Sequence, residues 1–579
     1  MSWKSTAAVI TGLVLLAATA SAQTPAPEVG PVPDFQVRMQ IATAAPASGR
    51  LILVAIRPEE RMTFAPPGQT ATPEQIQTRI IQQLPSLTEY LNVTGIGPSV
   101  SPTSSTVTRS VAGVKISEGQ SLTIGGGAQT YPAGPHFKPG VYFVQAILDT
   151  DGNYAYDQKP SHGDIVSPVT AYTYPGPPPV LTLNKVVPPA VHIWDQPAPA
   201  ANASPALLIQ YSHRQDAASH SDRVNVPSPA LTSFHHKPTA IRAYVVRPPG
   251  YETGSDHYPT VFRFEGFGGS YNTLAATIEQ MYADMASGAA PPMIWVFLDH
   301  AGPTGTHEFA DSANNGPWGK ALTEEFIPWL DSHYSTDGAS GRFTGGHSSG
   351  GWAALWLQVR YPKLFAGAWP TAPDPVDFHS FTNIDIYAPG ANAFREPDGT
   401  PTPLMRIANS DNTIPFKAYS DLESVTGEVG GQLASFDWVF SPRGANGRPK
   451  PLFDRGTGAV DPTVAAYWRD NYDITFIIRR DWARLKPDLN GKIHLWVGTR
   501  DTYHLDRPAR LLKATLDALG ARSEFHFVEG ASHSTLMTGT LPNGGVDFGA
   551  LERQLAWEMY AQARPNSALR PPAPVRKAA

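Results

Sequence analysis

A serine enclosed by glycines is the part of the chain whose residue types most directly suggest chemistry. Residues 346–350 are Gly-His-Ser-Ser-Gly, a match to G-x-S-x-G with Ser348 at its centre. Residues 342–344 before it are typical of a strand, and residues 351–361 after it are typical of a helix. A serine on a sharp turn between strand and helix presents its hydroxyl as a nucleophile, and the helix N-terminus favours negative charge beside it. The alternative is a glycine-rich turn that does no more than start a helix.

A serine nucleophile needs a base to take its proton and an acid to orient that base. Two late strand-like segments, residues 492–498 and 523–530, are each followed by such a group. Asp501 follows the first segment and His533 follows the second. The order serine, acid, histidine is the order known for hydrolases whose serine lies on a strand-to-helix turn. We therefore expect Asp501 as the acid and His533 as the base, with Glu529 as an alternative acid.

Other histidines are weaker candidates for the base. His494 and His526 fall inside the two strand-like segments, where we expect packed rings, and His347 lies within the turn itself.

An acyl-transfer site also needs hydrogen-bond donors for the oxyanion that forms during attack. The backbone N–H of Ser349, directly after the nucleophile, is the first expected donor. Residues 260–264 are an earlier strand-like run, and the glycine-rich turn that follows them would supply the second donor from Phe267 or Gly268. The alternative is an ordinary turn between a strand and a helix.

Strand-like and helix-like segments alternate along residues 206–565, which predicts an α/β fold with a mostly parallel sheet and helices on both faces. A Gly-, Pro- and Trp-rich stretch at about 375–490 interrupts the rhythm and is expected as an insertion over the carboxyl edge of the sheet. The strand-like runs are residues 241–249, 260–269, 293–299, 341–346, 492–498 and 523–530, and the helix-like runs are 273–287, 320–334, 352–361 and 507–520.

The preceding residues, 35–190, contain short β-branched and aromatic runs separated by Gly, Pro and Ser clusters, which predicts an all-β sandwich domain. One helix-like segment, residues 73–84, interrupts them, and the proline-rich residues 191–205 are expected to be a linker. Asp149, Asp151, Asn153 and Asp157 offer oxygen atoms at alternate positions, as a Ca²⁺ loop does. The loop lacks the glycine and glutamate of an EF-hand, so a hairpin turn is the favoured interpretation, and no metal or organic cofactor is expected.

The residues around Ser348 resemble one known family. The similar segments are Gly316-Pro317-Trp318-Gly319, 323–334, 343–367, 497–506 and 529–536. Through them the chain resembles the putative-esterase (esterase D-like) family of α/β-hydrolases over roughly residues 205 to 560. The resemblance implies an α/β-hydrolase catalytic domain, carboxylic ester hydrolysis, and a triad of Ser348, Asp501 and His533. The chain departs from many relatives in having Glu265-Gly266 where they have His-Gly, and in its long insertion.

Composition excludes several other classes of function. The 579 residues include 44 basic and 50 acidic side chains, a net charge of −6, so there is no electrostatic footprint for nucleic acid. The chain has no cysteine, which excludes disulfides, thiolate catalysis and cysteine-based zinc sites. The expected partner is a small-molecule or carbohydrate-linked ester, with no membrane anchor. The alternatives are an acyltransferase to an alcohol or sugar, and a catalytically inactive surface-binding protein.

The two ends of the chain differ in composition from the rest. Residues 1–22 have a basic start at Lys4, an apolar run and an Ala-Ser-Ala site, which predicts a signal peptide and a periplasmic or secreted protein. A proline-rich linker is expected at 23–34 and a disordered tail at 566–579.

Export predicts that the mature chain begins near Gln23, after the Ala-Ser-Ala site. N-terminal sequencing of protein recovered from the periplasm or the medium checks this. An intact Met1 on exported material would contradict it.

Overall fold

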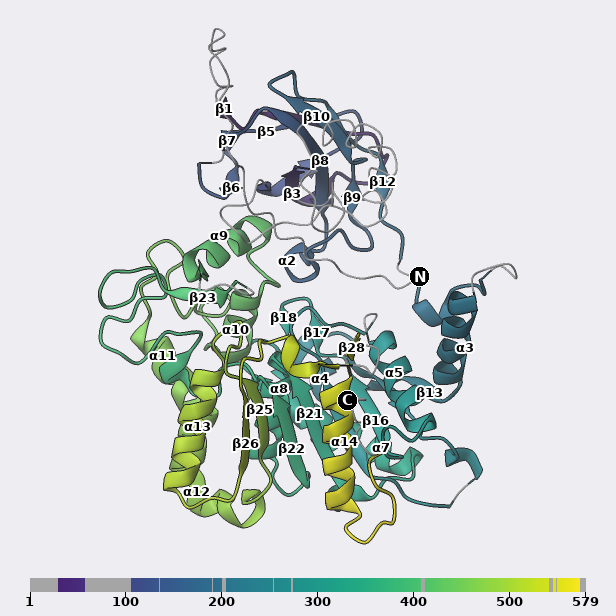
Figure 1. Ribbon diagram of the computed structural model, residues 1–579. Helices are drawn as coiled ribbons and strands as arrows, with labels where there is room; N and C mark the ends of the chain where they lie inside the picture. The colour runs from purple at the N-terminus through teal and green to yellow at the C-terminus, as the bar shows by residue number, and fades with distance from the viewer. Residues whose placement is uncertain are drawn as a thin grey trace, which may run out of the picture. The chain divides into compact units, whose positions relative to one another are not determined.

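The computed structural model describes residues 30–57 and 106–572, apart from short gaps at 135, 190, 200–204, 254, 272–273, 408–411, 541–544 and 548. The predicted helix at 73–84 and the predicted signal peptide lie outside these residues. The chain forms two compact units (Figure 1). One contains the residues up to Ala190 together with Ser420–Glu428, and the other contains the remainder from Val191 onward. No helix among the described residues is both long and apolar enough to cross a membrane.

The N-terminal unit is built from two main β-sheets. The smaller sheet has the order β11-β2-β5, and the larger has the order β12-β9-β8-β3-β4-β6 with β10 also paired to β8. The strands are β2 (Phe35–Met39), β3 (Ala47–Ile56), β4 (Val107–Ile116), β5 (Ser121–Ile124), β6 (Gln129–Tyr131), β8 (Gly140–Asp149), β9 (Ile165–Val166), β10 (Thr170–Tyr174), β11 (Leu181–Leu183) and β12 (Lys185–Val186), and β1 (Gly30–Pro31) pairs with β7 (His136–Phe137).

Both sheets bury one face in the same hydrophobic cluster. Val37 of β2 and Leu181 of β11 pack there with Leu53 of the central strand β3. The other face of β3 is also covered, because Val54 belongs to a second cluster that includes Tyr154. Two sheets over one core form the predicted β-sandwich.

The Asp-rich loop of this unit is longer than the hairpin turn that we favoured. It joins the antiparallel strands β8 and β9 but contains a short helix, α2 (Tyr154–Asp157). Tyr154 is fully buried, so the helix anchors the loop on the sheet.

The second unit has an eight-stranded sheet with the order β13-β14-β16-β15-β21-β22-β25-β26. The strands from β16 to β26 are parallel to one another, and β14 pairs antiparallel with both of its neighbours, β13 and β16. This is the mostly parallel sheet that the sequence predicts. The strands are β13 (Ser221–Pro227), β14 (Ala240–Val246), β15 (Thr260–Phe264), β16 (Ile294–Leu298), β21 (Arg342–His347), β22 (Gly367–Thr371), β25 (His494–Gly498) and β26 (Glu524–Val528).

Helices cover both faces of this sheet. On β21 the Thr344 hydroxyl donates to Ala354 O of helix α8 (Ser349–Arg360), 3.0 Å away. A Cβ on the next residue, Gly345, would lie 3.5 Å from the Met559 side chain of helix α14. Successive residues of a strand face opposite sides, so α8 and α14 lie on opposite faces. The main helices are α3 (Pro205–Ser219), α4 (Pro229–His235), α5 (Ala275–Ala286), α6 (Trp318–Ala321), α7 (Ile327–His333), α8 (Ser349–Arg360), α13 (Asp506–Ala518) and α14 (Ala550–Ala563).

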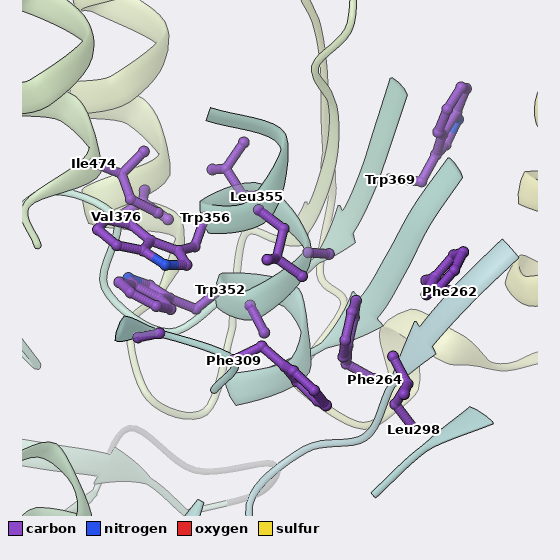
Figure 2. Packing of buried hydrophobic residues seen from close by; sticks show 14 of the residues in the cluster. Phe262, Phe264, Leu298, Phe309, Trp352, Leu355, Trp356, Trp369, Val376 and Ile474 are labelled. Atoms are coloured by element: carbon purple, nitrogen blue, oxygen red, sulfur yellow. The ribbon is translucent and has the colours of Figure 1, made fainter. Parts of the chain in front are cut away.

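The segment between β22 and β25 forms a largely helical insertion. Its helix α12 begins at Ile474, which Figure 2 shows beside Trp356 of α8 and near Val376. The insertion therefore shares the core of the sheet. It contains the hairpin β23 (Pro403–Arg406) and β24 (Thr413–Pro415), and the helices α9 (Phe416–Thr426), α10 (Gln432–Phe440), α11 (Pro462–Asn471) and α12 (Ile474–Leu489).

The stretch expected as a linker at 191–205 is partly folded. Residues Ile193–Asp195 form a 3-10 turn, and Trp194 is buried in the core of the second unit. The Trp194 indole donates to Glu279 on α5 at 3.0 Å. A large aromatic side chain whose N–H is hydrogen-bonded anchors its segment to the core. The prolines around Trp194 make the same stretch look like a linker in the sequence.

A buried ion pair ties strand β15 to helix α14. The Arg263 side chain is only 6% exposed, and its Nε lies 2.7 Å from Glu552 Oε1. A second hydrogen bond joins Arg263 Nη2 to Glu552 Oε2 at 3.2 Å, so the contact is bidentate. Because β15 leads directly into the turn expected to supply an oxyanion donor, the pair anchors the strand that carries that turn.

Glu552→Ala should lower the free energy of unfolding by about 3–5 kcal/mol, because it removes the bidentate carboxylate of a buried guanidinium and leaves only the looser contact to Glu265. Glu324→Ala is the control: its ion pair with Lys320 is more than half exposed, so its loss should cost at most about 0.5 kcal/mol. Urea unfolding followed by tryptophan fluorescence measures both. Equal effects of the two substitutions would contradict this account of the ion pair.

Candidate active site

Ser348 occupies a strained turn between β21 and α8. Its backbone angles are φ 58° and ψ −126°, a conformation that non-glycine residues rarely adopt. A Cβ on Gly346 would lie 2.2 Å from the carbonyl oxygen of Gly350, and a Cβ on Gly350 would lie 2.2 Å from that of Phe264. Both positions therefore require glycine. Ser348 is 8% exposed, so the turn is held within the packed end of the sheet.

Asp501 and His533 lie together at the ends of the two neighbouring strands β25 and β26. His533 Nδ1 and Asp501 Oδ2 are 2.8 Å apart, and Asp501 is fully buried. The other carboxylate oxygen of Asp501 accepts the backbone N–H groups of Tyr503 (2.9 Å) and Leu505 (3.2 Å). The carboxylate is thereby held in one orientation and directs the imidazole.

The imidazole of His533 reaches the turn that carries Ser348. Its ring centroid lies 4.4 Å from that of His347, the residue before Ser348, and 5.0 Å from the edge-on ring of Tyr503. Within the described residues, Ser348 Oγ donates to Asp374 Oδ1 at 3.4 Å rather than to His533.

The remaining candidates for acid and base have other environments. Glu529 is exposed. His494 stacks on Trp369 at 4.1 Å, and His526 stacks on Trp496 at 3.9 Å, as expected of packed rings. His347 is bonded through Nδ1 to the Thr371 hydroxyl at 3.0 Å.

The predicted oxyanion turn lies against Ser348. A Cβ on Gly266 would be 3.3 Å from Ser348 Cβ, and Gly269 N donates to Gly266 O at 3.0 Å to close the turn. Gly268 within it has φ 83°, which favours glycine. The carboxylate of Glu265 lies 3.9 Å from the guanidinium of Arg263, which offsets its negative charge. Phe267 and Gly268 thus lie on a turn adjacent to Ser348, and Ser349 begins helix α8.

Asp374 was not anticipated from the sequence. It follows strand β22 and is 3% exposed, and its Oδ2 accepts the Ser349 hydroxyl at 2.6 Å. Burial raises the pKa of Asp374 to about 6, while the Ser349 hydrogen bond and the nearby His533 oppose the shift. A position just after a parallel strand, which identified Asp501, would have identified Asp374 as well.

A second buried carboxyl lies near Asp374. Glu308 is fully buried, and its one polar neighbour that lowers its pKa is the Thr306 hydroxyl, which does not form a well-aligned hydrogen bond to it among the described residues. Burial and the neighbouring charge of Asp374 raise the pKa of Glu308 well above its usual range. The environment therefore favours the neutral acid at this position.

A small cavity of about 20 Å³, room for little more than one water molecule, lies beside these groups. Asp374, Tyr503 and Leu505 line one part of it, and the insertion supplies the remainder, including Leu404 and Phe436. This volume is far smaller than the roughly 300–1,000 Å³ of small-molecule pockets, so the cavity by itself does not hold an ester substrate. Because Tyr503 contacts the His533 ring, the cavity is adjacent to the histidine.

Two other clusters have geometry that could hold a cation. In each, three side chains offer one ligand atom apiece within 4.8 Å of one another: Asp377, His379 and Asp473, and Asp149, Asp151 and Asp164. In the first cluster, Asp473 accepts Tyr387 OH, and Asp377 bonds His379. In the second, Asp149 and Asp164 accept backbone N–H groups, and burial together with Asp164 raises the pKa of Asp149 to about 7. Hydrogen bonds within the protein account for both arrangements.

Asp374→Asn should change how stability depends on pH. Because the pKa of Asp374 is raised to about 6 on folding, its contribution to stability is complete below about pH 4 and is lost as the pH rises through about 6. Asparagine does not ionise, so the free energy of unfolding of the variant relative to wild type should increase between pH 4 and 7, by up to about 3 kcal/mol.

Urea titrations at several pH values measure this difference. Asp517→Asn is the control, since that carboxylate is 55% exposed. A difference between Asp374→Asn and wild type that stays constant with pH would show that Asp374 does not carry the raised pKa.

Comparison with known proteins identifies the family to which the chain belongs. Residues 236–534, more than half of the chain, match the family described as putative esterase. No curated protein matches the chain. Among solved structures, a ferulic acid esterase has 16% identity, covering 54% of this chain and 92% of its own with a TM-score of 0.33. An S-formylglutathione hydrolase from Agrobacterium tumefaciens has 13% identity, 59% and 94% coverage and a TM-score of 0.36. The fluorophosphonate-binding serine hydrolase F of Staphylococcus aureus has 12% identity, 59% and 98% coverage and a TM-score of 0.34. The family match carries the assignment: the chain belongs to the putative esterase family and is a carboxylic ester hydrolase of the α/β-hydrolase fold.

Proposed function

We propose that the protein is a serine esterase that hydrolyses carboxylic esters through Ser348, His533 and Asp501, by way of an acyl-enzyme. The observation that carries the proposal is the strained Ser348 turn beside an imidazole already oriented by a buried carboxylate. A serine on such a turn, a base within reach and an acid behind the base are the three parts that acyl transfer requires.

Attack begins when Ser348 Oγ leaves Asp374 for another staggered rotamer, within reach of His533. His533 Nε2 takes the hydroxyl proton as Oγ bonds to the ester carbonyl carbon. Asp501 stabilises the resulting imidazolium through Nδ1. The carbonyl oxygen becomes an oxyanion, for which we propose the backbone N–H of Ser349 and that of Phe267 or Gly268 as donors.

Collapse of the tetrahedral intermediate breaks the bond to the alcohol oxygen. His533 returns its proton to that oxygen, the alcohol leaves, and the acyl group remains on Ser348. Water then enters, loses a proton to His533 and attacks the acyl carbon, and the carboxylic acid leaves as Ser348 regains its proton. Each step uses only groups of the chain, the ester and water.

The family match supports a small-molecule ester as substrate, and we propose a small-molecule or carbohydrate-linked ester that binds beside Asp374 and Tyr503. The small cavity there mixes apolar side chains such as Leu404 and Phe436 with polar ones such as Gln432, so its lining does not select between hydrocarbon and polar substrate groups. A panel of p-nitrophenyl esters of rising chain length, with feruloyl and acetylated sugar esters, identifies the class.

Substitutions of the three residues should separate their roles. Ser348→Ala and His533→Ala should each lower kcat by about 10⁶, and the double variant should lose little more, because the residues act as a unit. Asp501→Asn keeps nucleophile and base but misorients the imidazole, so we expect a loss of about 10⁴. Steady-state kinetics on the best ester of the panel measures each loss.

Glu529→Gln is the matched control, since it removes the alternative acid and should leave kcat nearly unchanged. If Glu529→Gln abolishes activity while Asp501→Asn does not, the acid is misassigned. If Ser348→Ala keeps wild-type activity on every ester that wild type cleaves, the proposed mechanism fails.

A further inference from the structure

His300 is a buried side chain to which the proposed mechanism gives no role. It is 1% exposed and lies two residues past the end of strand β16. Strands β15 and β16 are parallel, with Phe264 paired to Leu298. Gly266 is two residues past Phe264, so the two loops leave the sheet in register. This register brings His300 beside the turn that faces Ser348.

One hydrogen bond joins His300 to that turn. His300 Nε2 lies 3.2 Å from the carbonyl oxygen of Gly266. A carbonyl oxygen only accepts, so Nε2 must carry the proton. Burial lowers the pKa of His300 to about 4, and the charge of Arg263 adds to the shift. The imidazole is therefore neutral at pH 7 and has one N–H, which it donates to Gly266.

The direction of the Gly266 carbonyl determines where the next N–H points. In a planar trans peptide the C=O and N–H bonds point in opposite directions. Holding Gly266 O toward His300 thus directs the N–H of Phe267 the other way. A Cβ on Gly266 would lie 3.9 Å from Ser348 Oγ, so this peptide begins next to the proposed nucleophile. The Gly269 N–H donates to Gly266 O at 3.0 Å from within the turn, and the His300 bond adds a restraint from outside it on a glycine peptide that has no side chain to resist rotation.

We propose that His300 is a positioning residue of the oxyanion hole, which clamps the Gly266–Phe267 peptide so that the Phe267 N–H faces the developing oxyanion. The inference rests on the proposed esterase function and deepens it. His300 touches no reacting atom and acts through Gly266. Its effect should be confined to the transition state, since a donor aimed at the oxyanion stabilises the tetrahedral species more than the ester.

The test compares variants that keep or remove the donor. His300→Phe keeps a ring of similar shape without an N–H, and His300→Gln places an amide nitrogen at the same number of bonds from Cα as Nε2. We expect His300→Phe to lower kcat by about 10²-fold, with KM changed less than about threefold. Its affinity for a trifluoromethyl ketone analogue, which forms a tetrahedral adduct on the serine, should fall in parallel. His300→Gln should recover most of both losses.

His494→Phe is the matched control. His494 is likewise a buried histidine, and it stacks on Trp369. It lies at the amino end of strand β25, whereas Ser348 follows the carboxyl end of β21. The kcat of this variant should stay near that of wild type. If His300→Phe does not fold, as judged by circular dichroism, His300→Asn replaces it, because its amide is one bond too short to reach Gly266. Asn should then show the loss and Gln the recovery.

The outcomes separate this inference from the proposed function. If Ser348→Ala is inactive but His300→Phe keeps kcat and analogue affinity within about threefold, the esterase stands and the clamp is overturned. A loss of kcat without a parallel loss of analogue affinity, or equal kcat in the Gln and Asn variants, also overturns it. If Ser348→Ala is fully active, the proposed function itself fails.

Discussion

The backbone turn at Ser348 is the constraint on which the rest of the site depends. Its positive φ costs of order 1–3 kcal/mol, which the surrounding structure must offset. Gly346 and Gly350 offset it by letting β21, α8 and the end of β15 approach until no Cβ would fit between them. The same close approach brings Gly266, which lies in the oxyanion turn, against Ser348. Nucleophile and oxyanion turn are thus parts of one packing arrangement.

Parallel strands then bring together residues that are far apart in the chain. Ser348, Asp374, Asp501 and His533 each follow the carboxyl end of a different strand of one sheet. Because these groups are buried, each carboxylate must either accept hydrogen bonds or be neutral. Asp501 has three hydrogen bonds. Asp374 has bonds from two serine hydroxyls, and its pKa is raised to about 6.

The residues that could be predicted from the sequence are those that a local sequence pattern identifies. A strand-like run followed within a few residues by Ser348, Asp501 or His533 needs no knowledge of distant contacts, and the alternation of runs predicts the mostly parallel sheet. His494 and His526 were recognisable as packed rings because they fall inside strands.

Other features depend on the path of the chain in space. Asp374 contacts Ser348 from the segment just after β22, where Ala372 has a positive φ of 38°. The role we infer for His300 depends on the register of β15 with β16, which no local pattern reveals. Trp194 lies in a proline-rich stretch expected as a linker, yet it packs into the core of the second unit.

The most direct test of the central claim is to trap the acyl-enzyme. Wild type mixed with excess ester, quenched in acid within milliseconds and digested, should show one acyl adduct by mass spectrometry, on the peptide that contains Ser348. The same experiment is repeated with Asp501→Asn. If this substitution lowers kcat mainly by slowing hydrolysis of the acyl-enzyme, the yield of that adduct should rise. An adduct on a different residue, or rapid turnover with no adduct on Ser348 in either protein, would contradict the account.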